Sequence, residues 1–273
     1  NEYIVTVTHG ATDFISAGDT PWNWELNIWY HTLNAGYRTP ISGETDFPCI
    51  FDERIGMARS YTKLDDKLDY DTFADEIRQG LNYVSDGRAH IFDFAIEDTR
   101  IADNKTELQL DTPQKVTITA KVAAFLPEKQ DRAAARIQHG GYQGRPYWHI
   151  EKARIPDTQK VTVELVINGK TIDQTQITAD GTVYDITFKH KIQKSSWVAL
   201  KITYAAHTNP IFIVIDKKPI RGPKESIQWC RDAVDRCWEM KKPRIRQSEL
   251  QAAEGRHNHE RNADDKILAE PSQ

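Results

Sequence analysis

Apolar and polar side chains alternate along the middle of the chain. In residues 116–122 every second side chain is apolar, which is the period of a half-buried strand. Residues 161–167 alternate in the same way, and Asn168-Gly169 supplies the two-residue turn of a hairpin. Asp180-Gly181 forms a second turn of this kind. Further strands are expected at residues 170–177, 182–189, 197–204 and 211–215. The pattern predicts an antiparallel, immunoglobulin-like β-sandwich over residues 105–221.

Strand-like and helical patterns alternate along residues 1–104. Short β-rich runs occupy residues 3–7, 13–17, 39–42 and 56–62. A helix is predicted from Pro21, a favoured first helical residue, to Gly36, which suits a left-handed stop. A second helix is predicted between Asp69, as its N-cap, and Gly80. Alternating strands and helices favour an α/β first domain.

The last part of the chain, residues 222–273, has a helical pattern. Apolar side chains recur there at three- and four-residue spacing, so we expect one helix face to pack against the rest of the protein. These side chains are Ile227, Cys230, Val234 and Cys237. Pro243 interrupts the pattern, and residues 247–268 are polar and helix-prone. We expect the two segments to form a helical hairpin.

Composition and charge exclude some partners. The chain has 273 residues, with 39% hydrophobic and 28% charged side chains, which is typical of two folded domains plus an appendage. A formal net charge of -4 offers no broad attraction for phosphate backbones, so nucleic acid is not an expected partner. No apolar run approaches the ~20 residues of a membrane span. Three cysteines fit either a cytoplasmic or an exported protein, so the localisation stays unknown.

Five residues in the first domain are candidates for chemistry. Asp46 follows a predicted buried strand, where α/β folds gather functional groups, and it either binds a metal or caps the backbone. His9 also follows a predicted strand, where its imidazole is either a ligand or an ordinary loop-edge group. His31 lies inside the first helix, where a structural hydrogen bond is the alternative. Arg38 and Arg54 flank this region and are able to hold an anion or to form surface ion pairs.

Two stretches of the first domain carry a family resemblance. They are Trp24-Glu25-Leu26-Asn27-Ile28-Trp29-Tyr30-His31 and Ser42-Gly43-Glu44-Thr45-Asp46-Phe47-Pro48. With matches in residues 53–61 and 83–87, they resemble the later half of the catalytic domain in CehA/McbA-type metallohydrolases, which belong to the polymerase-and-histidinol-phosphatase (PHP) superfamily. Residues 195–200 and 207–210 are similar to the C-terminal module attached to some members.

The resemblance implies a metal-dependent hydrolase domain. Such a domain is a distorted β/α barrel in which His and Asp side chains bind divalent ions, here zinc, manganese or iron, that activate water. Asp46 matches the Asp of the family's closing Asp-x-His motif, and His9 falls where a strand-end histidine ligand is expected. His31, Arg38 and Arg54 are then expected near the pocket, contacting a small-molecule substrate or supporting the metal ligands.

Two departures from the family pattern shape this expectation. Pro48 stands two residues after Asp46 in place of the motif's His, and the family's opening His-x-His has no counterpart. We therefore expect residues 1–104 to be the C-terminal half of a partial barrel, with a missing N-terminal region as its intramolecular partner. The fragment is expected to be inactive by itself, although the complete site would hydrolyse an ester, amide, carbamate or phosphoester.

Two other functions are compatible with the sequence. A non-catalytic protein would recognise carbohydrate or a cell-surface partner through the sandwich, and exposed aromatic side chains would favour this alternative. Tyr142, Tyr147 and Trp148 are the residues to inspect. A third alternative is an interaction module that docks through the helix carrying Trp229 and Trp238.

Overall fold

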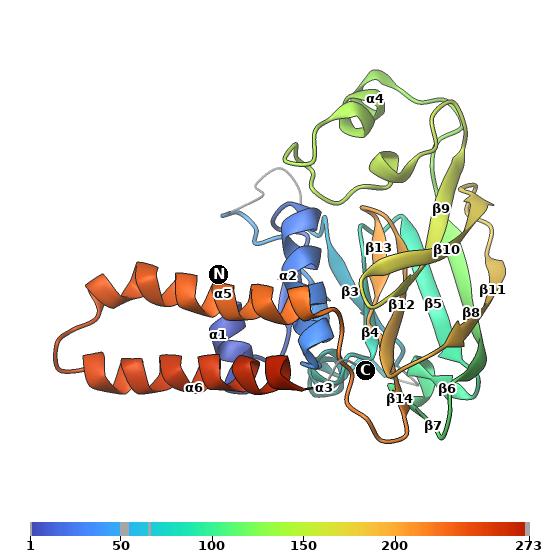
Figure 1. The fold of residues 1–273 in the computed structure, drawn as a ribbon. Helices are drawn as coiled ribbons and strands as arrows, with labels where there is room; N and C mark the ends of the chain where they lie inside the picture. The colour runs from blue at the N-terminus through green and yellow to red at the C-terminus, as the bar shows by residue number, and fades with distance from the viewer. Residues whose placement is uncertain (1, 50–54, 65–66, 271–273) are drawn as a thin grey trace.

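Two larger β-sheets, a small two-stranded sheet, a central helix and a projecting pair of C-terminal helices make up a mixed α/β structure (Figure 1). The computed structural model describes residues 2–49, 55–64 and 67–270. The α-helices are α1 (Tyr3–Thr8), α2 (Trp22–Ala35), α3 (Tyr70–Gln79), α4 (Arg132–His139), α5 (Lys224–Lys241) and α6 (Leu250–Ala269). The strands are β1 (Ile15–Ala17), β2 (Ile41–Gly43), β3 (Arg59–Thr62), β4 (Asn82–Ser85), β5 (Ala89–Ile96), β6 (Thr99–Arg100), β7 (Glu107–Leu110), β8 (Gln114–Ala124), β9 (Lys160–Ile167), β10 (Lys170–Thr178), β11 (Tyr184–Ile192), β12 (Ser196–Ile202), β13 (Ala206–Thr208) and β14 (Ile211–Ile215). Short 3₁₀ turns are η1 (Ile101–Asp103), η2 (Ile150–Ala153) and η3 (Lys242–Arg244).

The larger sheet has the strand order β10-β9-β12-β13-β4-β3, and β14 pairs with both β12 and β7. The predicted hairpin between β9 and β10 is confirmed, with Lys170 opposite Ile167. Asn168 and Gly169 both have positive φ, 50° and 84°, which is the backbone that a tight hairpin turn requires. Strand β4 pairs with β13, so the hydrogen bonds of this sheet cross the domain boundary expected near residue 104.

The smaller sheet has the order β11-β8-β5-β6 and faces the larger one across a shared core. Ile118 and Val122 of β8 are buried there beside Leu165 of β9 and Leu200 of β12. The turn at Asp180-Gly181 differs from our expectation, because it carries the chain from one sheet to the other. Its dipeptide signals a turn, but long-range pairing decides which sheet the next strand joins.

Helix α2 covers the outer face of the larger sheet. Its Trp29 and Leu33 are buried against Trp197 and Val84, and the helix ends at Gly36 in the left-handed region, as predicted. Strands β1 and β2 pair in parallel beside α2 as a separate small sheet. Among the described residues, no set of strands closes into a barrel.

Residues 3–7 form the helix α1, so the predicted strand is wrong. The run is short and apolar, and such a run fits either a helix or a strand period. The helix allows Tyr3 and Val7 to join the α2 core while Ile4 reaches the core beneath α5. Tertiary packing on two sides therefore overrides the local β preference.

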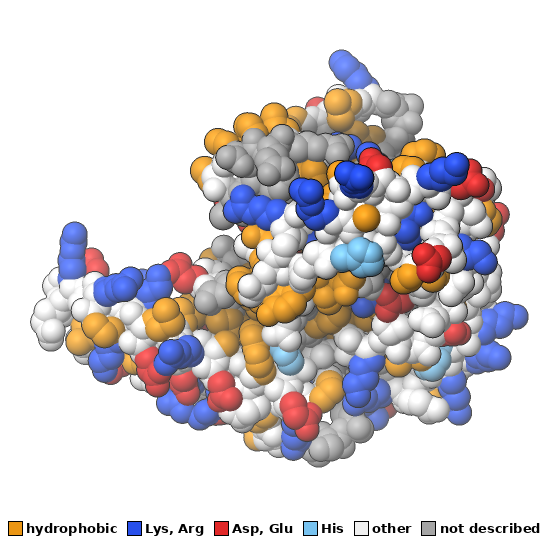
Figure 2. All heavy atoms as spheres, turned by 90° about the horizontal axis from the view of Figure 1, so that it is seen from above, with side chains coloured by type: hydrophobic (Ala, Val, Ile, Leu, Met, Phe, Trp, Pro, Cys, Tyr) orange, Lys and Arg blue, Asp and Glu red, His pale blue; other side chains and the backbone are white. Residues whose placement is uncertain are grey.

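The predicted helical hairpin is confirmed as α5 and α6, which lie side by side (Figure 1). The apolar stripe of α5 packs through Ile227, Cys230 and Val234 against Ile4 of α1 and Ala35 of α2. On the face shown in Figure 2, basic and acidic side chains are mixed with apolar ones along these projecting helices. None of the helices in the described ranges is long and apolar enough to cross a membrane.

Candidate functional site

The carboxyl ends of β1 and β2 bring two aspartates within electrostatic reach. Ile15 of β1 lies opposite Ile41 of β2, so the loops after both strands begin at the same edge of the sheet. Asp19 follows β1 and is partly buried, whereas Asp46 follows β2 and is exposed, with a left-handed φ of 50°. Burial, and then the charge of Asp46, raise the pKa of Asp19, while hydrogen bonds that include one to Glu25 act in the other direction.

A buried glutamate, Glu25, stands beside this pair. It lies on α2, four residues before Trp29 and on the same buried face. Its Oε1 accepts hydrogen bonds from the backbone N–H groups of Gly18 and Thr20, each at 2.9 Å. Its Oε2 accepts a hydrogen bond from the indole N–H of Trp148 at 2.9 Å. The Glu25 carboxylate therefore joins the β1–α2 loop to the loop that connects β8 and β9.

Burial raises the pKa of Glu25 to about 7, although its hydrogen bonds with Thr20, Trp148 and Gly18 favour the charged form. The charge of Asp19 raises it further. Removal of a carboxylate from water is the dominant cause, because the surrounding side chains solvate the charge less well than water does. A carboxyl group with this pKa exchanges its proton near neutral pH, as a general acid or base must.

A cavity of about 550 Å³ opens beside Asp19 and Glu25. Its walls come from α1, β1, the loop after β1, and α2, and they include the partly exposed rings of Phe14 and Trp24. This volume lies within the range of roughly 300–1,000 Å³ that is usual for small-molecule sites. Asp46 does not line the cavity, so its influence on the site is electrostatic.

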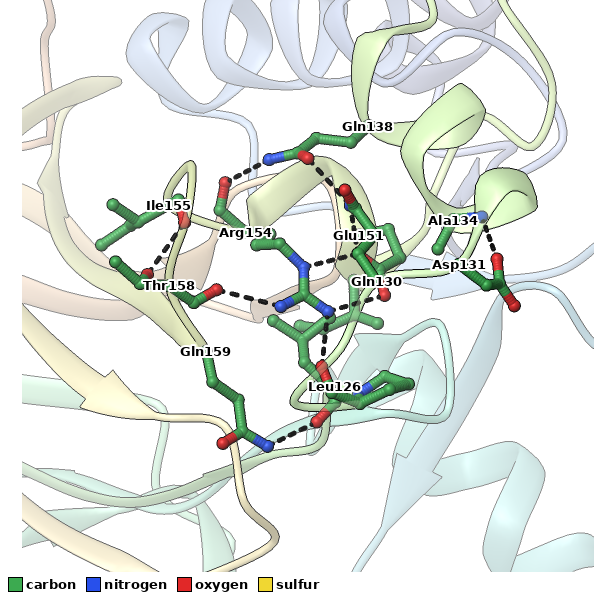
Figure 3. A network of polar contacts seen from close by, with 12 residues as sticks. Leu126, Gln130, Asp131, Ala134, Gln138, Glu151, Arg154, Ile155, Thr158 and Gln159 are labelled. Carbon is green, nitrogen blue, oxygen red and sulfur yellow. Dashed lines mark hydrogen bonds and ion pairs between the residues drawn. The ribbon is translucent and has the colours of Figure 1, made fainter.

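A buried ion-pair network holds the loop that carries Trp148 (Figure 3). Arg154 donates to both carboxylate oxygens of Glu151, at 2.7 and 3.0 Å, and to the carbonyl oxygen of Pro127 at 2.8 Å. Gln130 adds a hydrogen bond to Glu151 at 3.0 Å. Burial opposes the charge on Glu151, yet the hydrogen bonds and charge of Arg154 hold its pKa below the usual value. This fixed loop presents the Trp148 indole to Glu25.

His9 caps the C-terminal end of α1 and pairs with α6. Its Nε2 lies 2.6 Å from Oε1 of the buried Glu260, and its ring stacks on His259 with centroids 5.3 Å apart. It lines a different cavity, of about 570 Å³, between α1, α5 and α6. This cavity, which His9 lines, does not include Asp46.

His31 and Arg38 contact neighbouring elements rather than the Asp19 cavity. The His31 ring stacks on Trp229 of α5, with centroids 4.5 Å apart and planes 15° apart, and burial lowers its pKa. Arg38 forms an ion pair with Glu107 of β7, and its guanidinium lies 4.7 Å from the centroid of the Phe212 ring. Arg54, the remaining candidate from the sequence, lies outside the described residues.

The side chains near Asp46 do not by themselves fit a metal centre. Zinc, manganese or iron needs three or more His, Cys, Asp or Glu ligands around one point. Within residues 2–49, 55–64 and 67–270, no group of three such side chains is able to hold an ion. Glu25, the most buried carboxylate at this edge, already accepts hydrogen bonds on both oxygens.

Sequence reasoning did not single out Glu25 or its partner. Glu25, Trp29 and Leu33 are spaced i, i+4 and i+8, so they share one face of α2. A charged residue in such a buried stripe needs hydrogen-bond partners, which is a signal that the sequence does contain. The partner itself, Trp148, is 123 residues away, and no local pattern indicates that contact.

No family model and no curated protein matches this chain in sequence. The motifs and the geometry described above are therefore the basis for a functional proposal.

Proposed function

We propose that this chain is part of a metal-dependent hydrolase that cleaves an ester, amide, carbamate or phosphoester bond in a small molecule. One observation supports this best. Asp19, Glu25 and Asp46 lie near the carboxyl ends of two parallel strands, and Asp19 and Glu25 line a cavity of about 550 Å³ there. In α/β folds, ligands bind outside this edge of the sheet.

Each carboxyl group has a different role in the proposal. Glu25 lies on the cavity wall, and its raised pKa suits a group that takes up and returns a proton during hydrolysis. Burial is the main cause of the raised pKa of Glu25, and the charge of the neighbouring Asp19 adds to it. Asp46 is exposed, and its carboxylate has no hydrogen-bond partner among the described residues, so it is the residue that we assign to the metal.

The ion site of this hydrolase requires further ligands from residues that the structure does not describe. In this proposal residues 1–104 are the C-terminal half of a distorted β/α barrel, and residues 105–221 are an appended immunoglobulin-like module that is joined to it through the pairing of β4 with β13. His9 would join Asp46 only after leaving Glu260, to which it is paired at 2.6 Å. We therefore give His9 a weaker assignment than Asp46.

A substrate panel tests the proposal on the protein produced from its complete gene. An aryl acetate, an anilide, an aryl carbamate and an aryl phosphate would be offered with zinc, manganese or iron. We expect turnover of one class, and a loss of about 100-fold or more in Asp46→Ala, which is the scale of losing a group that stabilises the transition state.

The control for this panel is Asp157→Ala. Asp157 is also an exposed aspartate with positive φ, 60°, so both variants place alanine in the same strained backbone. Turnover should be unchanged in the Asp157 variant. Absence of turnover in all four classes, or equal turnover in the two variants, would contradict the hydrolase proposal.

Tyr142, Tyr147 and Trp148 give little support to the carbohydrate-binding alternative. Trp148 is buried, with 2% of its surface exposed, and its indole N–H is bound to Glu25. Tyr147 is half-buried, and only Tyr142 exposes about half of its surface, 53%. These three rings therefore do not form one exposed stacking face.

A further inference from the structure

A cavity of about 390 Å³ lies between the two sheets, where β3 and β4 of the larger sheet meet β5 of the smaller one. It is separate from the Asp19 cavity, and the two share no lining residue. Four aromatic residues line it, Tyr61 of β3 and Tyr83 of β4 from the larger sheet, and Phe92 and Phe94 of β5 from the smaller one. A cavity of this size and character suits a small ligand.

Contacts with neighbouring rings hold the two tyrosines in place. Tyr61 and Tyr83 stack with centroids 5.1 Å apart and planes 10° apart. The Tyr83 hydroxyl lies 2.9 Å from Nδ1 of His90, whose ring stands edge-on to Tyr61 at 5.0 Å. The two rings are thereby ordered before any ligand enters, which lowers the entropic cost of binding.

A single carboxylate lines the same cavity. Asp93 lies where the register of β5 against β8 shifts, and its φ is 53°. An aspartate tolerates this left-handed backbone, so the bulge alone accounts for part of the choice of residue. No hydrogen bond or ion pair joins the half-buried Asp93 carboxylate to another described residue. The bulge does not explain why a carboxylate without a counter-charge lies here.

We propose that this cavity binds a small organic ammonium ion, with the cationic head near Asp93 and its methyl or methylene groups against the aromatic rings. Ring faces attract cations, and the attraction grows when water is excluded. A carboxylate in an apolar wall adds a charge that an ammonium neutralises. Lys63 also lines the cavity, but it is exposed, and its long side chain reaches solvent. This inference does not depend on the hydrolase proposal.

Calorimetric titration with two isosteric probes tests the charge preference. Choline and 3,3-dimethylbutan-1-ol have the same shape and hydroxyl group, and they differ in one positive charge. We expect choline to bind about ten-fold more tightly or better, in line with a desolvated cation–π contact. Equal binding of the two probes, or no saturable binding of choline, would overturn the inference.

Two matched variants test the role of Asp93. Asp93→Asn removes the charge and keeps a residue that accepts positive φ, and we expect it to weaken choline binding about ten-fold while leaving the neutral probe unaffected. Asp157→Asn makes the same change at an exposed site with φ 60° and should leave both affinities unchanged. Circular dichroism would verify that both variants are folded. Undiminished choline binding by folded Asp93→Asn would exclude this site.

Discussion

At the scale of single residues, the structure depends on buried charged groups whose partners come from distant parts of the chain. Glu25 accepts a hydrogen bond from Trp148, and Glu151 holds Arg154 in a two-point ion pair. Such groups are costly to bury unless every partner is present. Substitution of one such residue should therefore lower the free energy of unfolding by more than substitution of an exposed charged residue does.

Glu25→Gln should lower the free energy of unfolding by about 1–3 kcal/mol at pH 8, because an amide nitrogen would face an N–H donor. The expected clash is with either the Trp148 indole or the backbone donors of Gly18 and Thr20. Urea denaturation measures the change. Glu128→Gln, at an exposed site, should stay within about 0.5 kcal/mol of the parent protein. Equal stability of the two variants would contradict the assigned role of Glu25.

Arg154→Met should destabilise the protein by about 3–5 kcal/mol, since it leaves the buried Glu151 without its counter-charge. The double variant Glu151→Gln/Arg154→Met removes both charges, and it should recover part of that loss. Urea denaturation of the parent, both single variants and the double variant gives the coupling between the two sites. A double variant less stable than Arg154→Met would be inconsistent with a penalty from an unpaired charge.

At the scale of elements, strong local signals were sufficient for several predictions. Gly36 and Gly80 end α2 and α3 in the left-handed region, and Asp69 caps α3 by accepting the backbone N–H of Thr72 at 2.9 Å. The β9–β10 hairpin also follows from two adjacent turn residues. In each case a few consecutive residues determine the backbone geometry.

Features that depend on contacts between distant parts of the chain were predicted wrongly or were missed. Residues 3–7 are helical because they pack against both α2 and α5, and no feature of that short run encodes two partners. For the candidate site, the sequence indicated Asp46 at the end of a strand. The neighbouring Glu25 and its bond to Trp148 required the assembled fold, because 123 residues separate those two side chains.

The docking of α5 is expected to depend on its buried stripe. Ile227→Ala should cost about 2–5 kcal/mol, because Ile227 is 2% exposed in the core shared with α1 and α2. Met240→Ala changes a residue on the same helix that is 60% exposed, and it should alter stability by less than about 0.5 kcal/mol. Thermal unfolding of both proteins makes the comparison. A similar cost at the two positions would argue against the observed packing of α5.

At the scale of the whole molecule, buried ionisable groups link stability to pH. His207 of β13 is buried and hydrogen-bonded on both ring nitrogens, accepting from the Tyr30 hydroxyl at 2.6 Å and donating to the Thr208 carbonyl at 2.7 Å. Burial lowers its pKa to about 3. Below pH about 6.5 the unfolded chain therefore binds a proton that the folded protein does not.

This difference predicts that His207 makes stability fall as pH drops from about 6.5 toward 3, by up to about 1.4 kcal/mol per pH unit. His207→Asn, although less stable overall, should show a shallower dependence of unfolding free energy on pH between about 6 and 4. His139→Asn, at an exposed site on α4, should keep the slope of the parent protein. Identical slopes in all three proteins would show that His207 does not remain neutral in the fold.

The metal content of the protein produced from its complete gene tests the hydrolase proposal most directly. Mass spectrometry of bound zinc, manganese and iron would be compared for the parent protein, Asp46→Ala and the backbone-matched control Asp157→Ala. The proposal predicts bound metal in the parent and the control, and a clear loss in Asp46→Ala. Equal metal content in all three proteins, or no bound metal in any of them, would contradict it.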